Sequence, residues 1–329
     1  MARRINLFLL AMIALAGIPF YWLMIDNRPG EAAAKPVSIA QLRQLANSLP
    51  GPAPAVVEYE AAALRLLPRG LFAAGHGLKR HPIFVLAFRL PVRGGKAILI
   101  DSGLSRADAE NLGFDIRFPD AQSRIERAME TAGLILFTHE HPDHMGAALR
   151  LGGPVMQSAR FNHNQLPAAP VAGTLVWPTG FTPRAEITGT APQAVAPGVV
   201  VIPAPSHTPG SQMIFVQLAD GKEFLFAGDI ATLDASWKEQ RARSRLLSDF
   251  IIDEDRPEVF AWLRTIARLK SEAPGLNIVP GHDINVGRRD TAQDDLGGGE
   301  DGSAQQPVDA ADRGWAAAAK RGFSAEFPI

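Results

Sequence analysis

The chain has 329 residues, of which 47% are hydrophobic and 20% are charged, a composition typical of a folded globular protein and not of a disordered one. It contains no cysteine, which excludes disulfide bonds, thiolate metal ligands and a cysteine nucleophile. The formal net charge of −1 gives no electrostatic reason to expect a nucleic-acid partner.

The N-terminal segment, residues 1–28, is predicted to be a membrane anchor or a signal segment. Arg3 and Arg4 precede an apolar run over 5–25, which matches the roughly 20 residues that cross a bilayer core. A cleaved signal has a shorter apolar region of about 7–15 residues, so the run favours an anchor. Small residues at 14–16 and 32–34 still resemble cleavage sites. We therefore expect export, with the folded domain on the periplasmic side of the cytoplasmic membrane, or secretion after cleavage.

Three further segments follow the N-terminus. Residues 29–55 are rich in Pro, Ala and Gly and are predicted to be a linker with one short helix near 39–48. A folded domain is expected over 56–290. The tail 291–329 begins with an acidic, glycine-rich stretch and is predicted to be of low complexity and mobile.

Short apolar runs separated by turns predict the strands of the folded domain. Continuous runs of this kind suit strands that are buried on both faces. Asp220-Gly221 between two runs predicts a hairpin, and helices are expected over 122–132 and 256–271. This mixture of short strands and helices predicts sheets that are covered by helices. The segment 167–197 is predicted to be a loop. The predicted strands cover 83–88, 97–100, 134–137, 199–202, 213–216, 224–226 and 277–279.

The segment after the predicted strand 134–137 carries the first candidate metal ligands, His139, His141, Asp143 and His144. If that strand continues, His139 and His141 project to the same side, because strand side chains repeat every two residues. Asp143 and His144 follow the break at Pro142 and could turn onto a second centre. Imidazole and carboxylate ligands suit Zn²⁺, and also Mn or Fe.

Three more candidate ligands follow later strands. His207, Asp229 and His282 each stand where a predicted strand gives way to a turn that contains Gly or Pro. A rigid sheet can present side chains from several strand ends to one point. We therefore expect all seven residues to converge.

With these motifs, the chain resembles the metallo-β-lactamase fold superfamily across about residues 56–290. The resemblance implies an α/β (α+β) protein, an αββα sandwich of two mixed β-sheets with helices on the outer faces and metals at one edge. It assigns His139, His141 and His207 to a first metal and Asp143, His144 and His282 to a second. Asp229 becomes the carboxylate that bridges two divalent metal ions, and Asp101 is expected to orient a ligand histidine, unless it only caps the segment after it.

The same resemblance implies hydrolysis. Two metals would share a hydroxide that attacks the substrate, so the protein needs no nucleophile of its own. Asp143 and Asp229 are the expected catalytic residues, Asp143 because it could also take up a proton.

Other polar residues are given simpler interpretations. His76, His81 and His163 are expected to be solvated or capping residues, and Asp283 a turn residue. Trp237, Lys238 and Arg241 could line a pocket, but a solvated basic face is the simpler reading.

Details of the pattern rank the branches of the superfamily. A bridging Asp229 points away from the zinc β-lactamases, and His141 stands where flavodiiron relatives carry Glu. The acidic tail lacks the basic glutathione-binding segment of glyoxalase II. Lactonases often use a Tyr near the site, but Tyr21 and Tyr59 lie outside the half that bears the motifs.

The expected activity is cleavage of a small-molecule carboxylic ester or lactone. The alternatives are a phosphodiesterase on the same dinuclear site, a mononuclear iron oxygenase related to sulfur dioxygenases, and a membrane-tethered binding protein with a degenerate site. The sequence leaves the substrate and the oligomeric state open.

Overall fold

Two β-sheets face each other in the computed structural model, which describes residues 2–114, 116–284 and 316–317. The first sheet has the strand order β13-β1-β2-β3-β5-β6-β7, with β4 paired to β1, and the second has the order β12-β11-β10-β9-β8. Both sheets are mixed, because β3, β5, β6 and β7 run parallel to one another and β11 runs parallel to β12. The strands of the first sheet are β1 (Glu58–Pro68), β2 (Arg80–Leu90), β3 (Ile98–Ile100), β4 (Ile116–Arg117), β5 (Leu134–Leu136), β6 (Ala159–Asn162), β7 (Ala185–Ile187) and β13 (Ala316–Ala317). Those of the second are β8 (Gln193–Ala196), β9 (Val199–Pro203), β10 (Gln212–Gln217), β11 (Glu223–Gly228) and β12 (Asn277–Pro280).

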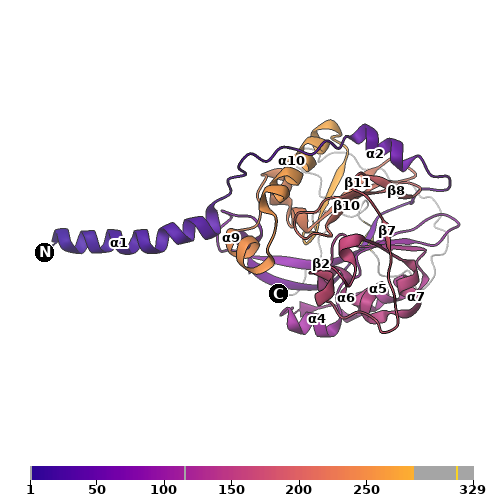
Figure 1. Ribbon diagram of the computed structural model, residues 1–329, viewed down its shortest axis with the longest axis horizontal. Helices are drawn as coiled ribbons and strands as arrows, with labels where there is room; N and C mark the ends of the chain where they lie inside the picture. Colours follow the sequence, from indigo (N-terminus) through magenta and orange to yellow (C-terminus); the bar gives the residue numbers. More distant parts are fainter. Residues whose placement is uncertain (1, 115, 285–315, 318–329) are drawn as a thin grey trace, which may run out of the picture.

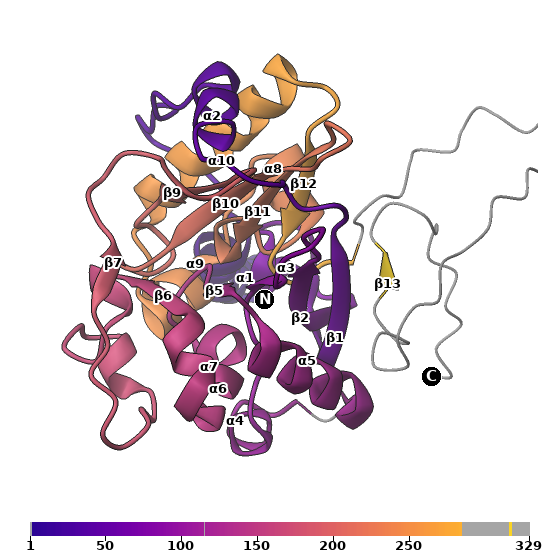
Figure 2. The ribbon, with the colours of Figure 1, turned by 90° about the vertical axis from the view of Figure 1, so that its right-hand side faces the viewer.

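Helices cover the outer face of each sheet, so the molecule has four layers (Figure 2). The first sheet is covered by α4 (Arg106–Asn111), α5 (Pro119–Thr131), α6 (Pro142–Leu151) and α7 (Gly153–Ser158). The second is covered by α2 (Ile39–Ala46) and α10 (Arg256–Glu272). The remaining helices are α1 (Ala2–Phe20), α3 (Arg69–Phe72), α8 (Asp234–Lys238), α9 (Arg245–Leu247), the π-helices η1 (Tyr21–Ile25) and η5 (Ser248–Ile252), and the 3₁₀ turns η2 (His163–Gln165), η3 (Ala172–Thr174) and η4 (Asp229–Ala231). The predicted αββα sandwich is confirmed.

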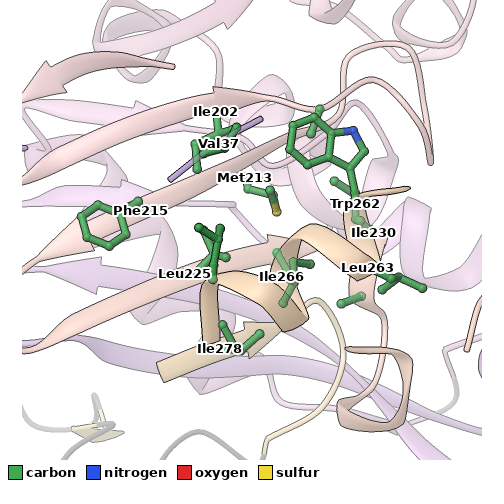
Figure 3. Close-up of a cluster of buried hydrophobic side chains, with 14 of the residues drawn as sticks. Val37, Ile202, Met213, Phe215, Leu225, Ile230, Trp262, Leu263, Ile266 and Ile278 are labelled. Carbon is green, nitrogen blue, oxygen red and sulfur yellow. The ribbon is translucent and has the colours of Figure 1, made fainter. Parts of the chain in front are cut away.

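The continuous apolar runs form strands because each face of a strand meets a different apolar layer. In β9, Val199 and Val201 point into the layer between the sheets, whereas Val200 and Ile202 point toward α2 and α10. This alternation is the two-residue period of a strand, and with both faces covered every position is apolar. Figure 3 shows the outer layer, in which side chains of the second sheet pack against Trp262, Leu263 and Ile266 of α10.

Apart from elements that were not predicted, such as β1, β6 and α6, the predicted elements differ from the structure in two places. Each predicted strand and both predicted helices are found, and Leu218 to Lys222 form the tight turn between β10 and β11. The strand before the first ligands ends at Leu136, so 137–141 is a bent loop and not the continued strand considered above. The segment 167–197 contains β7 and β8, short edge strands whose few residues leave no clear pattern.

The N-terminal apolar run forms α1 followed by η1. None of the helices among the described residues combines the length and the apolar character that crossing a membrane requires. The predicted tail 291–329 lies outside the described residues except for 316–317, and so do residues 285–290 of the predicted domain.

The segment 29–55, predicted as a linker, packs on the second sheet through α2. Val37, Ile39, Leu42 and Ala46 are buried in the same layer as α10. Ser38 caps α2 by accepting a hydrogen bond from the backbone N–H of Gln41, as an N-cap serine commonly does. The short predicted helix is therefore present, and its apolar face completes the cover of the sheet.

Candidate metal centre

Seven side chains converge at one edge of the two sheets. They come from the loop after β5, the first turn of α6, the loop between β9 and β10, and the ends of β11 and β12. Two groups have ligand atoms within 4.8 Å of one another: His139, His141, His207 and Asp229 form the first group, and Asp143, His144 and His282 form the second. The structure therefore brings together all seven of the candidate ligands predicted from the sequence.

The first group has three imidazole nitrogens that face one another. Nδ1 of His141 lies 3.0 Å from Nε2 of His139 and 3.1 Å from Nε2 of His207. One ring nitrogen carries either one proton or one lone pair, so it cannot satisfy two facing nitrogens at once. Three nitrogens that point to a common centre, with a carboxylate beside them, instead form the donor set of a zinc-like metal.

The second group is built on the start of α6. The carboxylate Oδ2 of Asp143 lies 3.6 Å from Nε2 of His282 and 3.8 Å from Nε2 of His144. Nε2 of His144 is buried and has no hydrogen-bond partner among the described residues. A buried polar atom without a partner is costly, and a metal ion would satisfy it. The donor sets of both groups thus fit divalent metal ions.

Asp229 lies between the two groups. Its Oδ2 is 3.5 Å from Nε2 of His207, in the first group, and its Oδ1 is 2.9 Å from Nε2 of His282, in the second. Oδ2 also lies 3.1 Å from Nε2 of His282, so the carboxylate reaches both groups, as a bridging ligand requires. Gly281 makes this approach possible, because a Cβ at that position would lie 2.2 Å from Oδ1 of Asp229.

Burial and charge set the protonation of the histidines differently in the two groups. Burial, reinforced by His207, lowers the pKa of His141 to about 3, and burial holds the pKa of His139 well below its ordinary value. Burial also disfavours charge on His144, but the carboxylates of Asp101 and Asp143 outweigh it and raise its pKa to about 10. The histidines of the first group are therefore neutral and ready to coordinate, whereas a metal at the second would displace protons.

Asp101 holds His144 in place, as the sequence suggested. Its Oδ2 lies 2.9 Å from Nδ1 of His144, and its Oδ1 accepts a hydrogen bond of 2.7 Å from the backbone N–H of Thr138. The hydroxyl of Thr138 donates to the same carboxylate at 2.8 Å. Asp101 adopts a left-handed backbone with φ of 59° at the end of β3, an uncommon conformation that aims its side chain at these partners.

We expect Asp101→Asn to weaken metal binding selectively at the second group. An amide has a single oxygen, so it cannot accept from both the backbone N–H of Thr138 and Nδ1 of His144, and loss of such an orienting partner costs about 10–100-fold in metal affinity. Metal titration of the chelator-treated protein should show one weakened site and one unchanged site. Asp120→Asn, on the exposed first turn of α5, is the control and should change neither. Equal loss at both sites would contradict the assignment of His144 to a separate metal.

Glu140 joins the two loops that carry the first group. Its carboxylate accepts hydrogen bonds from the hydroxyl of Thr208 at 2.7 Å and from the backbone N–H of Gly210 at 2.8 Å. Burial raises the pKa of Glu140. Because Glu140 adjoins His139 and His141 while Thr208 adjoins His207, this contact fixes the three histidines relative to one another.

Two buried charged residues at the site were missed by the sequence analysis. Arg243 donates to Oδ2 of Asp229 at 2.8 Å and to the carboxylate of Glu254, and Oε1 of Glu254 lies 2.5 Å from Nδ1 of His207. Burial raises the pKa of Glu254, but Arg243 and His207 outweigh it and keep the pKa low. Neither residue belongs to a recognisable motif, and no spacing in the sequence connects them to the ligands.

The other residues considered from the sequence lie outside the two groups. His76 pairs with Glu239 at 3.0 Å, His163 begins η2, and His81 lies 3.9 Å from Asp283. The basic face is paired locally, because Lys238 binds Asp234 and Arg241 binds Glu239, and Trp237 also donates to Asp234. Asp283 accepts a backbone hydrogen bond from Asp234, in keeping with a turn residue.

Comparisons with known proteins agree with this geometry. The family model described as "Metallo-beta-lactamase superfamily" matches residues 82–282. No curated protein matches the chain. Among solved structures, a quorum-quenching N-acyl homoserine lactone lactonase superposes with a TM-score of 0.55 at 15% identity, covering 73% of this chain and 96% of its own. An N-acyl homoserine lactone hydrolase with product bound at its catalytic metal centre gives a TM-score of 0.53 at 17% identity, with coverages of 70% and 94%. A probable metal-dependent hydrolase from Staphylococcus aureus gives 0.51 at 14% identity, with coverages of 72% and 92%.

Proposed function

Because this chain belongs to the metallo-beta-lactamase superfamily, we propose that it is a metal-dependent hydrolase that cleaves a carboxylic ester or a lactone. The observation that carries the proposal is the position of Asp229, whose carboxylate lies between two separate groups of candidate ligands and reaches both. When bound, two divalent metals, for which the imidazole-rich donor set favours Zn²⁺, would supply Lewis acidity and an activated water.

The chain's own residues support hydrolysis by water over attack by a side chain. The sequence has no cysteine, and the hydroxyl of Thr138, 3.2 Å from ring nitrogens of His139 and His144, is buried and donates to Asp101. His141 and Asp143 are the ligand candidates that remain partly exposed, so the substrate would enter beside them. Asp143 stands at this opening with its carboxylate near His282, where it could hold a proton for the leaving oxygen.

The choice of an ester or lactone rests on the neighbours in structure. Two of the matched structures are of enzymes named for hydrolysis of N-acyl homoserine lactones. At 15% and 17% identity the likeness extends to the fold alone, so the bond that is cut is the part of the proposal that most needs experiment.

Metal analysis of the full chain, combined with a substrate panel, tests the proposed function. We expect close to two divalent metals per chain and hydrolysis of a lactone, aryl ester or thioester that stops on chelation and returns with added metal. Bis-phosphodiester substrates belong in the same panel, and their preferred cleavage would make the protein a phosphodiesterase. One iron per chain with oxygen uptake would instead overturn the dinuclear hydrolase in favour of an oxygenase.

His141→Ala should remove metal and activity together. His141 provides the nitrogen that faces both His139 and His207, so its loss opens the centre of the first group. Metal content and hydrolysis are measured on the same preparation, with His76→Ala, which pairs only with Glu239 among the contacts described, as the control. Activity that survives without metal would refute the assignment.

Export and attachment to the membrane through the N-terminal segment are part of the proposal. They are supported by Arg3 and Arg4 before the apolar run 5–25. Cell fractionation with N-terminal sequencing of the recovered protein checks both: an intact N-terminus in the membrane fraction is expected, and a soluble cytoplasmic protein would contradict it.

A further inference from the structure

A patch of exposed apolar side chains lies where the N-terminal helix meets the catalytic domain. The patch consists of Tyr21 and Trp22 of η1 and of Leu246, Phe250 and Ile251 of α9 and η5. Phe250 and Ile251 are each 64% exposed, and the ring of Phe250 lies 6.0 Å from that of Trp22 in an edge-to-face arrangement. Figure 1 shows α1 projecting from the body with α9 beside its attached end. Residues far apart in the sequence therefore form one apolar surface.

Three charged groups beside this patch are paired with one another. Arg245 lies over the ring of Trp22 and binds both Asp26 and Asp249, each at 3.0 Å. Because these charges are already paired, removing water from the patch costs little free energy. The patch is thus suited to contact with an apolar phase.

The N-terminal segment is fixed to the catalytic domain at this place and does not hang from a free linker. Asp26 is buried, and its backbone carbonyl accepts a hydrogen bond of 2.8 Å from Arg256. The side chain of Asn27 bonds to the backbone of both Gln240 and Ala242, and the carbonyl of Met24 accepts from Gly75. The direction of the apolar helix therefore sets the direction in which the patch faces.

The helix joined to the patch is apolar on every side. Its exposed residues Leu10, Ile13, Leu15 and Ile18 point in different directions around the axis at about 100° per residue. A helix that packs into a protein groove is apolar on one stripe, whereas one that is apolar all round needs an apolar surrounding. Tyr and Trp at the end of such a helix are the residues that favour the boundary between lipid and water.

We propose that the patch of Tyr21, Trp22, Leu246, Phe250 and Ile251 rests on the surface of a lipid bilayer, so that the catalytic domain itself contacts the membrane. The loop that contributes Leu246, Phe250 and Ile251 runs between Arg243 and Glu254, the two residues that brace Asp229 and His207. The contact would hold the metal centre close to the lipid surface. This inference rests on the membrane attachment proposed above and is independent of the bond that the enzyme cuts.

Site-specific labelling of the full chain tests the contact. Because the sequence has no cysteine, Phe250→Cys introduces a single site for an environment-sensitive fluorophore. The labelled protein is mixed with vesicles of phosphatidylcholine and phosphatidylglycerol, with and without nitroxide-labelled lipid. The control is Val176→Cys, because Val176 is also an exposed apolar residue, at 82%, but lies outside the patch. Ile251→Cys is a second reporter should the first variant fold poorly.

We expect the nitroxide lipid to quench most of the emission at position 250 or 251 and none at position 176, while flotation shows the same vesicle binding for all variants. Vesicle-bound protein with no quenching at 250 and 251 would overturn the proposal, and so would failure of the wild-type chain to float with the vesicles. A label at 250 that is shielded from aqueous iodide in the absence of lipid would show that a second copy or another protein covers the patch, which also overturns it.

Discussion

Asp229→Asn should reduce the bound metal from two ions per chain to one or none and lower hydrolysis by more than about 100-fold. The expected loss exceeds the roughly 10–100-fold that follows removal of an outer partner of a metal ligand, because Asp229 would be a ligand of both ions. Its carboxylate lies within 3.5 Å of both His207 and His282, and an amide cannot offer an anionic oxygen to both sides. Metal content after dialysis, and kcat/KM for the best substrate of the panel, measure the effect.

Asp220→Asn is the matched control for this change. Asp220 is an exposed carboxylate in the turn between β10 and β11, paired with Lys222. It should leave both metal content and rate unchanged. Two tightly bound metals in Asp229→Asn would show that the carboxylate does not bridge and would require a different second site.

Arg243→Met should lower the free energy of unfolding of the metal-free protein by about 3–5 kcal/mol, because it leaves Asp229 and Glu254 buried without their cation. The pKa of Asp229 would be raised by burial, but His282 and Arg243 hold it well below its ordinary range, and Arg243 also keeps the pKa of Glu254 low. Carboxylates with depressed pKa values stabilise the fold above their unfolded-state pKa, and this stability is lost as the pH falls. The difference in the free energy of unfolding between wild type and variant should therefore be largest at neutral pH and become smaller in acid.

Denaturant unfolding of the chelator-treated proteins at pH 7 and in acid measures this difference. Lys238→Met is the control, because Lys238 is half exposed, lies over the ring of Trp237, and makes a pair with Asp234 four residues away that is worth about 0.3–0.5 kcal/mol. Arg243→Lys should fall between wild type and Arg243→Met, since one ammonium cannot reach both carboxylates with the geometry of a guanidinium. A variant Arg243→Met as stable as the control would mean that the two carboxylates do not depend on this cation.

The seven candidate ligands could be predicted because each stands beside a strong local signal. His139 to His144 directly follow an apolar run, and His207, Asp229 and His282 each follow another, with Gly or Pro at the turn. Strand ends are fixed by the apolar pattern, and a sheet brings the ends of its strands to one edge. The same patterns predicted the buried strands, whose side chains alternate between two apolar layers.

Contacts between distant segments could not be predicted in this way. The packing of α2 on the second sheet depends on Ile39 and Leu42 meeting α10, and the residues around α2 have the composition of a linker. The short strands β7 and β8 exist because neighbouring strands supply their hydrogen bonds, although their own sequence is typical of loop.

By itself, the sequence determined the buried strands and the residues at their ends, because hydrophobic period and turn residues are local properties of the chain. The sandwich of two sheets was implied by the family resemblance that those residues carry. Only the tertiary structure decided that Asp229 lies between the two groups, that Arg243 and Glu254 brace the centre, and that Trp22 meets Phe250 on one apolar surface. These relations join residues that the sequence separates, and they arise from the burial of charge and the packing of side chains once the chain has folded.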